Sequence, residues 1–333
     1  MKAIVFDRFG EPAEVLQLRD VPRSEPGRGE VRVRMRASPI NPSDLLVVRG
    51  QYGRLPTLPA TPGFEGVGVI EAAGPGFLKV LRGLKPGRRV AVLNGRGGNW
   101  QEEVVLPARQ VVPLPVDIPD EQAAAFFVNP ATALVMTQWV LRVPRGAWLL
   151  QTAAGSALGR MVLRLGRLYG FRTINVVRRR EQAEELLRLG GDAAIATNDE
   201  SLEERVRGLT EGSGVPFALD AVGGTTAAAV TRVLAPGGRM LLYGTLSGEP
   251  IALEPRALMA GQKSIAGFWL SEWVRAQGVL TMLKLFRRIK GLLRAGVLTS
   301  EVGASFALDQ IKDAVRQAET PGRHGKVLLR MAE

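Results

Sequence analysis

The sequence has no cysteine and a single histidine, His324. The first absence excludes disulfide bonds and every metal site that needs a thiolate ligand. A tetrahedral zinc site takes three or four ligands from cysteine, histidine and carboxylate side chains, and one histidine with carboxylates is a poor set. We therefore expect this protein to hold no metal ion.

Long apolar runs are also absent. The most apolar long stretch, residues 123–143, is interrupted by Asn129, Pro130, Thr137 and Gln138. It predicts a buried helix with a proline near its first turn rather than a membrane span. The amino terminus passes directly into the strand-like segment AIVFDRFG, which lacks the composition of a targeting sequence. We expect a cytoplasmic protein that does not enter a membrane.

The composition that remains is that of a globular enzyme. Hydrophobic residues make up 46% and charged residues 23% of the 333-residue chain, and this length predicts two domains. The formal net charge is +12, and 36 of the 44 basic residues are arginines spread along the chain. No RNP, homeodomain or zinc-knuckle pattern accompanies them, so we expect no specific nucleic-acid partner. Two explanations of the charge stay open: a solvated basic surface, or attraction of an anionic substrate or partner.

The pattern of the sequence changes near residue 120. Residues 1–120 contain short strand-like runs separated by Gly and Pro, and in EVRVRMRAS apolar residues alternate with arginines. This alternation predicts a half-buried strand with a solvated basic face, in a small barrel-like β domain. Residues 121–296 alternate strand-like and helical segments, which predicts a doubly wound parallel sheet. Residues 297–333 end in KVLLRM, a strand expected to return to the first domain.

The segment VLTMLKLFRRIKGLLRAG, residues 279–296, predicts an amphipathic helix. Its buried stripe is expected to consist of Leu280, Leu283, Phe286, Ile289, Leu292 and Leu293. The basic residues opposite this stripe either keep the protein soluble or steer an anionic substrate carrier.

The segment LLQTAAGSALGR lies where a dinucleotide-binding fold has its glycine-rich turn between strand and helix. The G-x-G-x-x-G pattern aligns with residues 154–159, so only its last glycine, Gly159, is in place. Small residues still permit a pyrophosphate to approach the backbone, and the helix amino terminus supplies N–H groups and a favourable dipole. A tight strand–helix turn without a ligand is the alternative.

The next strand-like run, RTINVV, is followed by three arginines, Arg178, Arg179 and Arg180. An NAD site places Asp or Glu here to bind the ribose 2′-hydroxyl, whereas cations suit the 2′-phosphate of NADP(H). We therefore predict NADPH as the coenzyme. The alternative is a solvated helix start, although the helix dipole disfavours positive charge there.

Four stretches, INPSDLLVVRGQYG, VNPATA, RTINVVRRR and GFWLSEW, resemble the medium-chain dehydrogenase/reductase superfamily and, within it, the zinc-free 2-enoyl thioester reductases. The stretches lie in both expected domains. The tyrosine eleven residues after Asn41 and the Phe-Trp-x-x-x-Trp pattern are the most particular to enoyl reductases, whereas NPSD is shared with quinone reductases. In zinc-dependent members the stretch similar to PGFEG reads Gly-His-Glu with a metal-binding histidine, and here Phe64 stands in its place.

The resemblance implies an α/β fold made of a GroES-like β-barrel catalytic domain and a Rossmann-type NADPH-binding domain. It implies hydride transfer from NADPH to the β-carbon of a trans-2-enoyl thioester, as in fatty acid synthesis, with Tyr52 donating a hydrogen bond or proton to the developing enolate. It implies cofactor contacts at Asn41, Asn129, Thr132, Gly155, Ser156, Ala157, Leu158, Arg178, Arg179, Arg180, Tyr243, Gly244, Thr245, Leu246, Phe268, Trp269, Leu270 and Lys326. It implies substrate contacts at Trp269 and Trp273, for which a place in the core or at a dimer interface is the alternative.

Two of these positions depart from the family pattern. Ala157 and Thr245 stand where family members commonly have glycine, and both add side-chain bulk near the expected phosphates.

The resemblance also implies partners. The substrate is expected to be carried by CoA or by acyl carrier protein. The strand KSIAGFW comes last in the doubly wound sheet and is expected to pair with its copy in a homodimer. Two other functions stay open: an NADPH-dependent quinone oxidoreductase, and a non-catalytic protein that binds NADPH and RNA.

Overall fold

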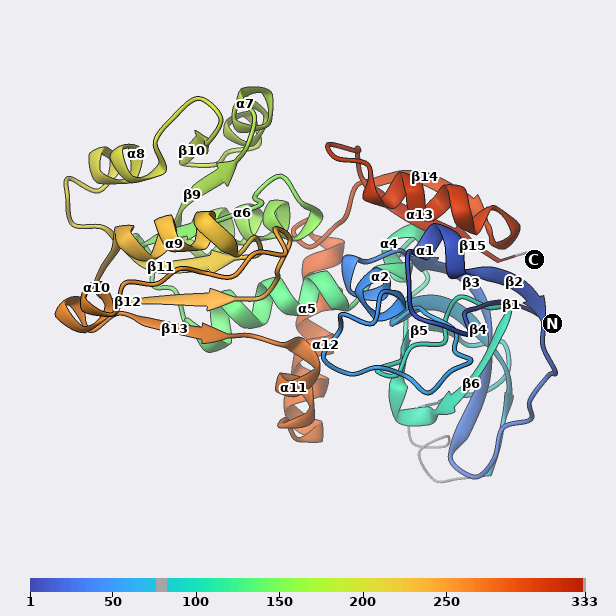
Figure 1. Ribbon diagram of the computed structural model, residues 1–333. Helices are drawn as coiled ribbons and strands as arrows, with labels where there is room; N and C mark the ends of the chain where they lie inside the picture. Colours follow the sequence, from blue (N-terminus) through green and yellow to red (C-terminus); the bar gives the residue numbers. More distant parts are fainter. Residues whose placement is uncertain (76–82, 332–333) are drawn as a thin grey trace. The chain divides into compact units, whose positions relative to one another are not determined.

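The computed structural model of the protein describes residues 1–75 and 83–331 (Figure 1). The chain forms two compact units. Unit 1 consists of residues 1–128 and 286–333, and unit 2 consists of residues 129–285. The chain therefore leaves unit 1 once and returns to it once.

Unit 1 is built mainly of β-strands. Its strands are β1 (Lys2–Val5), β2 (Gln17–Asp20), β3 (Glu30–Pro39), β4 (Glu65–Ala73), β5 (Arg89–Leu93), β6 (Glu103–Pro107), β7 (Val111–Pro113), β14 (Val302–Ala307) and β15 (Lys326–Arg330). Its helices are α1 (Pro12–Val15), α2 (Pro42–Val48), η1 (Ala108–Gln110), α4 (Asp120–Ala124), η3 (Leu308–Gln310) and α13 (Ile311–Glu319). The sequence predicts divisions after residues 120 and 296, whereas the compact units divide inside two helices, α5 (Val128–Leu134) and α12 (Val279–Arg294).

Strand β3 is the centre of the larger sheet of unit 1, whose order is β14-β15-β3-β4-β5-β7 with β6 also paired to β3. It runs antiparallel to β4, β6 and β15. The register of β3 against β4 shifts between Arg32 and Val33 and again between Met35 and Ala37. Such irregularities bend a strand and increase its twist, which suits a sheet that curls around a core. That core includes Phe6, Trp100 and residues from most of these strands.

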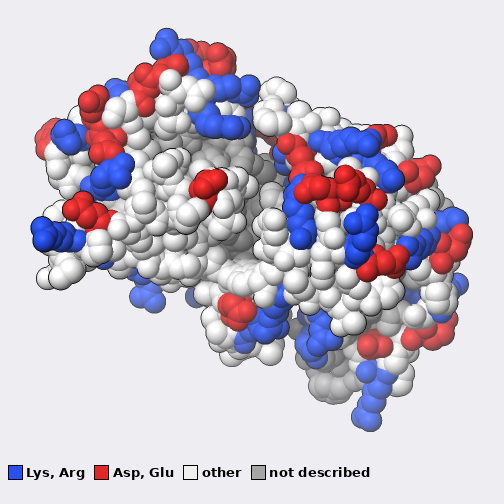
Figure 2. All heavy atoms as spheres, viewed as in Figure 1, with Lys and Arg blue, Asp and Glu red and all other residues white. Residues whose placement is uncertain are grey.

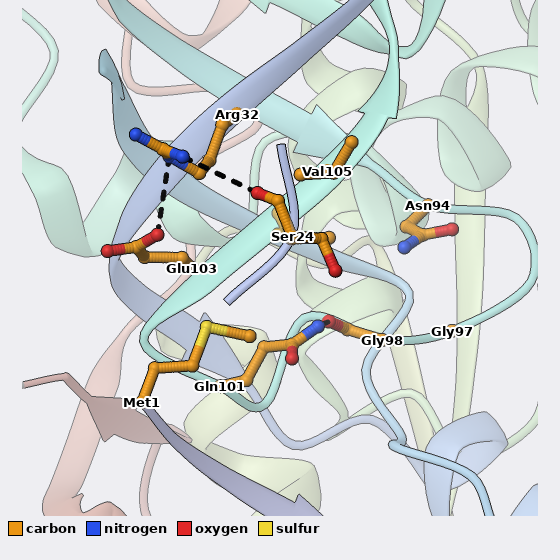
Figure 3. Close-up of a pocket in the computed structure, with 10 residues that line it drawn as sticks. Met1, Ser24, Arg32, Asn94, Gly97, Gly98, Gln101, Glu103 and Val105 are labelled. Carbon is orange, nitrogen blue, oxygen red and sulfur yellow. Dashed lines mark hydrogen bonds and ion pairs between the residues drawn. The ribbon is translucent and has the colours of Figure 1, made fainter. Parts of the chain in front are cut away.

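The alternating strand β3 departs from its predicted pattern at one arginine. Arg34 and Arg36 are exposed, as a solvated basic face requires, but Arg32 is only 8% exposed. Its guanidinium forms ion pairs with Glu25 and with Glu103. Arg32 and Glu103 both line a cavity of unit 1, where Figure 3 shows their ion pair. The expectation of a fully solvated basic face is therefore wrong for Arg32, because neighbouring carboxylates compensate its charge and permit burial.

Unit 2 is a six-stranded parallel sheet with its crossover helices. Its strands are β8 (Trp148–Gln151), β9 (Arg172–Val177), β10 (Ala193–Ala196), β11 (Val215–Asp220), β12 (Leu234–Leu242) and β13 (Ser264–Gly267). Its helices are α6 (Ala157–Tyr169), α7 (Arg180–Arg188), α8 (Leu202–Leu209), α9 (Gly224–Val233), α10 (Pro255–Gly261) and α11 (Leu270–Arg275), with the π-helical η2 (Val135–Val140) directly after α5. The strand order β10-β9-β8-β11-β12-β13 is that of a doubly wound dinucleotide-binding sheet.

The two faces of this sheet bury two separate sets of apolar side chains. Since successive residues of a strand point to opposite faces, β10 contributes Ala193 and Ile195 to one cluster and Ala194 and Ala196 to the other. The first cluster includes side chains from α8 and α9, and the second includes side chains from α6 and α7. Helices therefore cover both faces, as the sequence predicts for a doubly wound sheet.

The apolar stretch at residues 123–143 does not form the single helix that the sequence predicts. Helix α4 ends at Ala124, α5 begins at Val128, and η2 continues α5 to Val140. Among the described residues, no helix is long and apolar enough to span a membrane.

Helix α12 buries only part of the predicted stripe: Phe286, Ile289 and Leu293 are buried as predicted. Leu280 is 83% exposed and Leu283 is 46% exposed, which makes the expectation for these two residues wrong. The buried side chains begin at Leu285 and Phe286, where the chain enters unit 1. The rings of Phe126 and Phe127 lie 6.4 and 5.7 Å from that of Phe286. Tertiary packing, rather than helical periodicity, thus decides where burial starts.

Acidic and basic side chains are interspersed on the face of the molecule shown in Figure 2. The basic side chains on this face are thus distributed over both units rather than gathered into one stripe.

Candidate active site

In unit 2, the turn between β8 and α6 presents a helix amino terminus to solvent. Ser156 caps α6, because its side-chain oxygen accepts a hydrogen bond from the N–H of Gly159 at 3.1 Å. The first turn of α6 carries no acidic residue, so the N–H groups and the dipole of a 13-residue helix are available to an anion. Gly155 and Ser156 of the predicted pyrophosphate contacts lie in this turn, and Ala157 and Leu158 begin the helix.

The one glycine that survives from the expected pattern is required by packing. A side-chain carbon at Gly159 would lie 2.3 Å from the carbonyl oxygen of Ala154, a distance that two heavy atoms cannot adopt. At Gly155 the same carbon would find its nearest neighbour at 3.6 Å, which is ordinary contact. Gly159 thus fixes the approach of helix to strand, whereas Gly155 keeps the surface of the turn open.

The three arginines after β9 differ in their surroundings. All three are exposed, and Nε of Arg180 lies 3.4 Å from the carboxylate of Asp199. Within the part of the chain that the structure describes, Arg178 and Arg179 have no ion-pair partner. Two exposed guanidinium groups at the carboxyl end of the strand next to β8 fit a phosphate dianion, so these residues fit the 2′-phosphate of NADPH.

The carboxyl ends of β8, β11 and β12 bring together buried polar groups that the sequence analysis does not single out. Thr152 donates a hydrogen bond to Asp220 at 2.7 Å, and the N–H of Gly223 donates to the other oxygen of that carboxylate at 2.8 Å. Burial raises the pKa of Asp220. These groups lie at the point where the strand order reverses, between β8 and β11, and ligands of such sheets bind beside this point.

Tyr243, a predicted cofactor contact, follows β12 at the same edge. Its hydroxyl oxygen is buried and has no hydrogen-bond partner in the described part of the chain. Burial, together with the nearby charge of Asp220, raises the pKa of Tyr243. Gly244 follows it at a place where an added side-chain carbon would lie 2.7 Å from the carbonyl oxygen of Ala221. A buried unpartnered hydroxyl is costly, so a bound polar ligand at this edge is a natural partner for it.

The remaining predicted residues of unit 2 lie on several elements. Asn129 and Thr132 are on α5, and Thr132 is buried. Thr245 and Leu246 follow Gly244, with Leu246 61% exposed. Phe268 follows β13, and Trp269, Leu270 and Trp273 lie at the start of α11 or within it. The ring of Trp273 lies 5.4 Å from that of Trp139.

In unit 1, Asn41 and Lys326 are brought together although 285 residues separate them in the sequence. The ammonium group of Lys326 donates to the side-chain oxygen of Asn41 at 2.5 Å, and the side-chain nitrogen of Asn41 donates to Glu65 at 3.1 Å. All three side chains are almost completely buried. Glu65 also accepts hydrogen bonds from the N–H groups of Phe127 and Val128, each at 2.9 Å.

Asp44 completes this buried cluster. Its two carboxylate oxygens accept hydrogen bonds from the backbone N–H groups of Asn41, at 2.8 Å, and of Phe64, at 3.0 Å. Burial, reinforced by the charge of Glu65, raises the pKa of Asp44 to about 7. Burial also lowers the pKa of Lys326. Neither Glu65 nor Asp44 is among the site residues predicted from the sequence, and a carboxylate at the first position of an apolar strand is the signal that could have identified Glu65.

Tyr52 lies after α2 and packs against the hydrophobic core of unit 1. It is partly buried, and its ring lies 5.4 Å from the ring of Phe64, tilted by 39°. The aromatic ring of Phe64 therefore packs against the ring of the tyrosine predicted to be catalytic. Among the described residues, no group of three or more His, Asp or Glu side chains is arranged to hold a metal ion.

Comparison with known proteins gives the same family in sequence and in structure. Residues 27–116 match the alcohol dehydrogenase GroES-like domain, and residues 157–286 match the zinc-binding dehydrogenase domain. The chain is 32% identical to the mitochondrial enoyl-[acyl-carrier-protein] reductase of Homo sapiens, over 99% of this chain and 89% of that one. It is 33% identical to the mitochondrial enzyme of the same name from Arabidopsis thaliana, over 90% and 80% of the two chains.

Solved structures with the same fold include two quinone reductases. A putative NADPH:quinone reductase from Bacillus thuringiensis is 35% identical, with a TM-score of 0.92 over 99% of this chain and 98% of that one. The quinone oxidoreductase of Escherichia coli, solved in complex with NADPH, is 25% identical, with a TM-score of 0.91 over 99% of this chain and 100% of that one.

Proposed function

The chain belongs to the medium-chain dehydrogenase/reductase family, and on that premise we propose that it reduces a trans-2-enoyl thioester with NADPH. As a member of this family it is an oxidoreductase that uses a nicotinamide dinucleotide. The proposal specifies three further points: the coenzyme carries a 2′-phosphate, the β-carbon of the substrate receives the hydride, and no metal ion takes part.

The observation that carries the proposal is the similarity to enoyl-[acyl-carrier-protein] reductases along 99% of the chain. Arg178 and Arg179, which are exposed and have no ion-pair partner in residues 1–75 and 83–331, support the choice of NADPH, because a charge-assisted hydrogen bond to a phosphate dianion is among the strongest that a side chain makes. The buried hydroxyl of Tyr243 supports a polar ligand at the carboxyl edge of the parallel sheet.

NADPH would supply the hydride in this reaction. In unit 2 the turn at Gly155 and the amino terminus of α6 would hold its pyrophosphate, and Arg178 and Arg179 its 2′-phosphate. As hydride reaches the β-carbon, negative charge develops on the thioester oxygen. Tyr52 would donate its hydroxyl hydrogen to that oxygen and stabilise the enolate, which is then protonated at the α-carbon.

In unit 1 the buried cluster would hold Asn41 in place for contact with the coenzyme. Lys326 donates to the oxygen of its amide and Glu65 accepts from the nitrogen, so the orientation of the amide is fixed from both ends. An asparagine held in this way loses little conformational entropy when a ligand binds.

An NADPH-dependent quinone oxidoreductase is the second candidate. It is favoured by the solved structures, of which the 35% identical one is described as a putative NADPH:quinone reductase. The two candidates differ in the acceptor of the hydride and not in the coenzyme.

The experiment that separates them follows the absorbance of NADPH with three acceptors: crotonyl-CoA, a longer trans-2-enoyl-CoA and an ortho-quinone. We expect rapid oxidation of NADPH with the enoyl thioesters. Turnover of the quinone alone would replace the proposal by the second candidate. Tight binding of NADPH without turnover of any acceptor would favour a non-catalytic protein.

A further inference from the structure

Unit 2 contains a cavity of about 360 Å³ between η2 and the helices α11 and α12. Its lining includes Gln138, Trp139 and Arg142 from η2 and the residues after it, Trp273 from α11, and Thr281 and Lys284 from α12. Of these residues, the sequence predicts a substrate contact at Trp273 and a place for Lys284 among the basic residues of α12. The volume lies near the lower end of the range of about 300–1,000 Å³ for small-molecule sites.

Two indole rings form an apolar corner of this cavity. The ring centroids of Trp139 and Trp273 lie 5.4 Å apart, and the ring planes are inclined by 50°. A flat aromatic group can therefore stack on one ring while the other meets its edge, which is a favourable arrangement for aromatic pairs. Stacking on tryptophan accepts every nucleobase, because each base has an aromatic face.

The polar groups of the lining are mainly hydrogen-bond donors. Arg142 and Lys284 are exposed cations, and neither has an ion-pair partner among the described residues. The side-chain nitrogen of Gln138 is buried and has no hydrogen-bond partner in the same part of the chain. Leaving such a group unpaired is costly, and a bound acceptor would remove the cost.

Helix α12 adds to the attraction for negative charge. It has 16 residues and no acidic residue in its first turn, where Thr281 lies. The positive end of its dipole and the ammonium group of Lys284, three residues after Thr281, therefore act on the same cavity. Aromatic rings beside unpaired cations suit a ligand that joins a flat base to phosphate groups.

We propose that this cavity binds the nucleotide end of coenzyme A, with adenine against the two tryptophans and phosphate at Arg142 and Lys284. This inference rests on the proposed function and makes it more specific, since it assigns CoA rather than acyl carrier protein as the carrier of the substrate. A carrier protein would be expected to bury about 800 Å² of each partner in a standard interface, and it would not need a recessed aromatic corner.

The binding test uses adenosine 3′-phosphate 5′-diphosphate, which is the nucleotide end of CoA, as the probe. Isothermal titration calorimetry is done on protein already saturated with NADP⁺, so that the probe does not occupy the dinucleotide site. We expect one further molecule to bind to the parent protein. In the double variant Arg142→Glu with Lys284→Glu, we expect the affinity for the probe to fall at least about 10-fold, as loss of charge-assisted contacts predicts.

The matched control reverses the charge of two exposed arginines of unit 2 that do not line the cavity, in the double variant Arg188→Glu with Arg207→Glu. It changes the net charge by the same amount, and its affinity for the probe should equal that of the parent. The neutral pair Arg142→Gln with Lys284→Gln gives a second variant in case charge reversal disturbs folding. Equal affinity for the probe in parent and both cavity variants would overturn the inference.

A kinetic test uses two thioesters of the same acyl group, crotonyl-CoA and crotonyl-pantetheine, which lacks the nucleotide. We expect the cavity variants to raise KM for crotonyl-CoA and to leave KM for crotonyl-pantetheine unchanged. An equal rise for both thioesters, or a loss of kcat/KM seen only with a crotonyl-loaded acyl carrier protein, would refute the assignment of CoA. Failure of the parent to reduce any enoyl thioester would refute the proposed function, while the calorimetric result would still decide whether the cavity binds the nucleotide.

Discussion

At the scale of single residues, the chemistry proposed for unit 1 depends on one hydroxyl group beside an aromatic ring. Tyr52 packs against Phe64, and a ring at position 64 offers no electron pair to a metal ion. If no metal ion neutralises the charge that develops on the thioester oxygen, a hydrogen-bond donor must do so. Tyr52 is the donor that the sequence predicts.

We expect Tyr52→Phe to lower kcat for an enoyl thioester by about 10²-fold or more, which is the usual effect of losing an acid or an oxyanion donor. The affinity for NADPH should not change, because the variant keeps the aromatic ring. Steady-state kinetics and a coenzyme titration measure the two effects. Tyr169→Phe, a change at the end of α6, is the control, and equal kcat in the Tyr52 variant and the parent would remove Tyr52 from the mechanism.

The buried carboxylate of Asp44 leads to a prediction about stability and pH. Its pKa is about 7 in the folded protein against an ordinary value of 3.8. Between these two values the folded protein keeps a proton that the unfolded chain has lost, so the stability contributed by this group falls as the pH rises. Asp44→Asn removes the titration and one hydrogen-bond acceptor.

We therefore expect the free energy of unfolding of the parent to fall, relative to that of Asp44→Asn, by about 1–3 kcal/mol between pH 5 and pH 8. Urea unfolding at a series of pH values measures the difference. Most surface carboxylates are already ionised over this range, so they contribute little to it. Parallel stability curves for parent and variant would show that Asp44 does not titrate in this window.

At the scale of elements, the β8–α6 turn shows how a dinucleotide turn can keep its geometry with one glycine. Gly159 is required by its contact with the backbone of Ala154, which is itself buried in the core, whereas Ser156 in the middle of the motif is exposed. The next element in the sheet, β9, is followed by the arginines that we propose determine the choice of coenzyme.

We expect the double variant Arg178→Ala with Arg179→Ala to weaken NADPH binding by roughly 10- to 150-fold, since a charge-assisted hydrogen bond contributes about 1.5–3 kcal/mol. Binding of NADH should be nearly unaffected, because NADH has no 2′-phosphate. Dissociation constants from the quenching of protein fluorescence provide the measurement. Arg188→Ala, in the last turn of α7, is the control; if both coenzymes lost affinity equally, the arginines would have a structural role.

At the scale of the whole molecule, the parallel sheet of unit 2 ends in a strand with one neighbour. Strand β13 pairs with β12 and stands last in the sheet order. The N–H of Phe268 donates to the carbonyl of Leu242 in β12 at 2.7 Å. Because the direction of N–H groups alternates along a strand, the N–H of Gly267 should point away from β12. An unpaired edge of this kind is a template for a second copy of the chain.

We propose a homodimer formed by antiparallel pairing of two β13 edges, and Gly267→Pro is the variant that tests it. Proline removes the outward N–H, and a side chain at position 267 meets no other atom within 4 Å. Sedimentation at micromolar concentration should show a dimer for the parent and for the control Gly267→Ala, and a monomer for Gly267→Pro. A monomeric parent would refute the dimer.

Much of the fold was determined by local pattern. Alternation of strand-like and helical segments predicts the doubly wound sheet, because a parallel strand must be followed by a crossover that returns along its face. The family was likewise predictable from short stretches such as NPSD and FWLSEW, whose residue types and spacing resemble those of the family.

Only the tertiary structure decided the surroundings of the individual side chains. Periodicity places Leu280 and Leu283 in a buried stripe, yet both are exposed because burial depends on what covers a face and not on the face itself. Alternation places Arg32 in solvent, yet it is buried and forms ion pairs with Glu25 and with Glu103, which is 71 residues away in the sequence. The bonds that join Lys326 and Glu65 to Asn41 are formed between residues far apart in the chain, and no local pattern determines which distant groups meet.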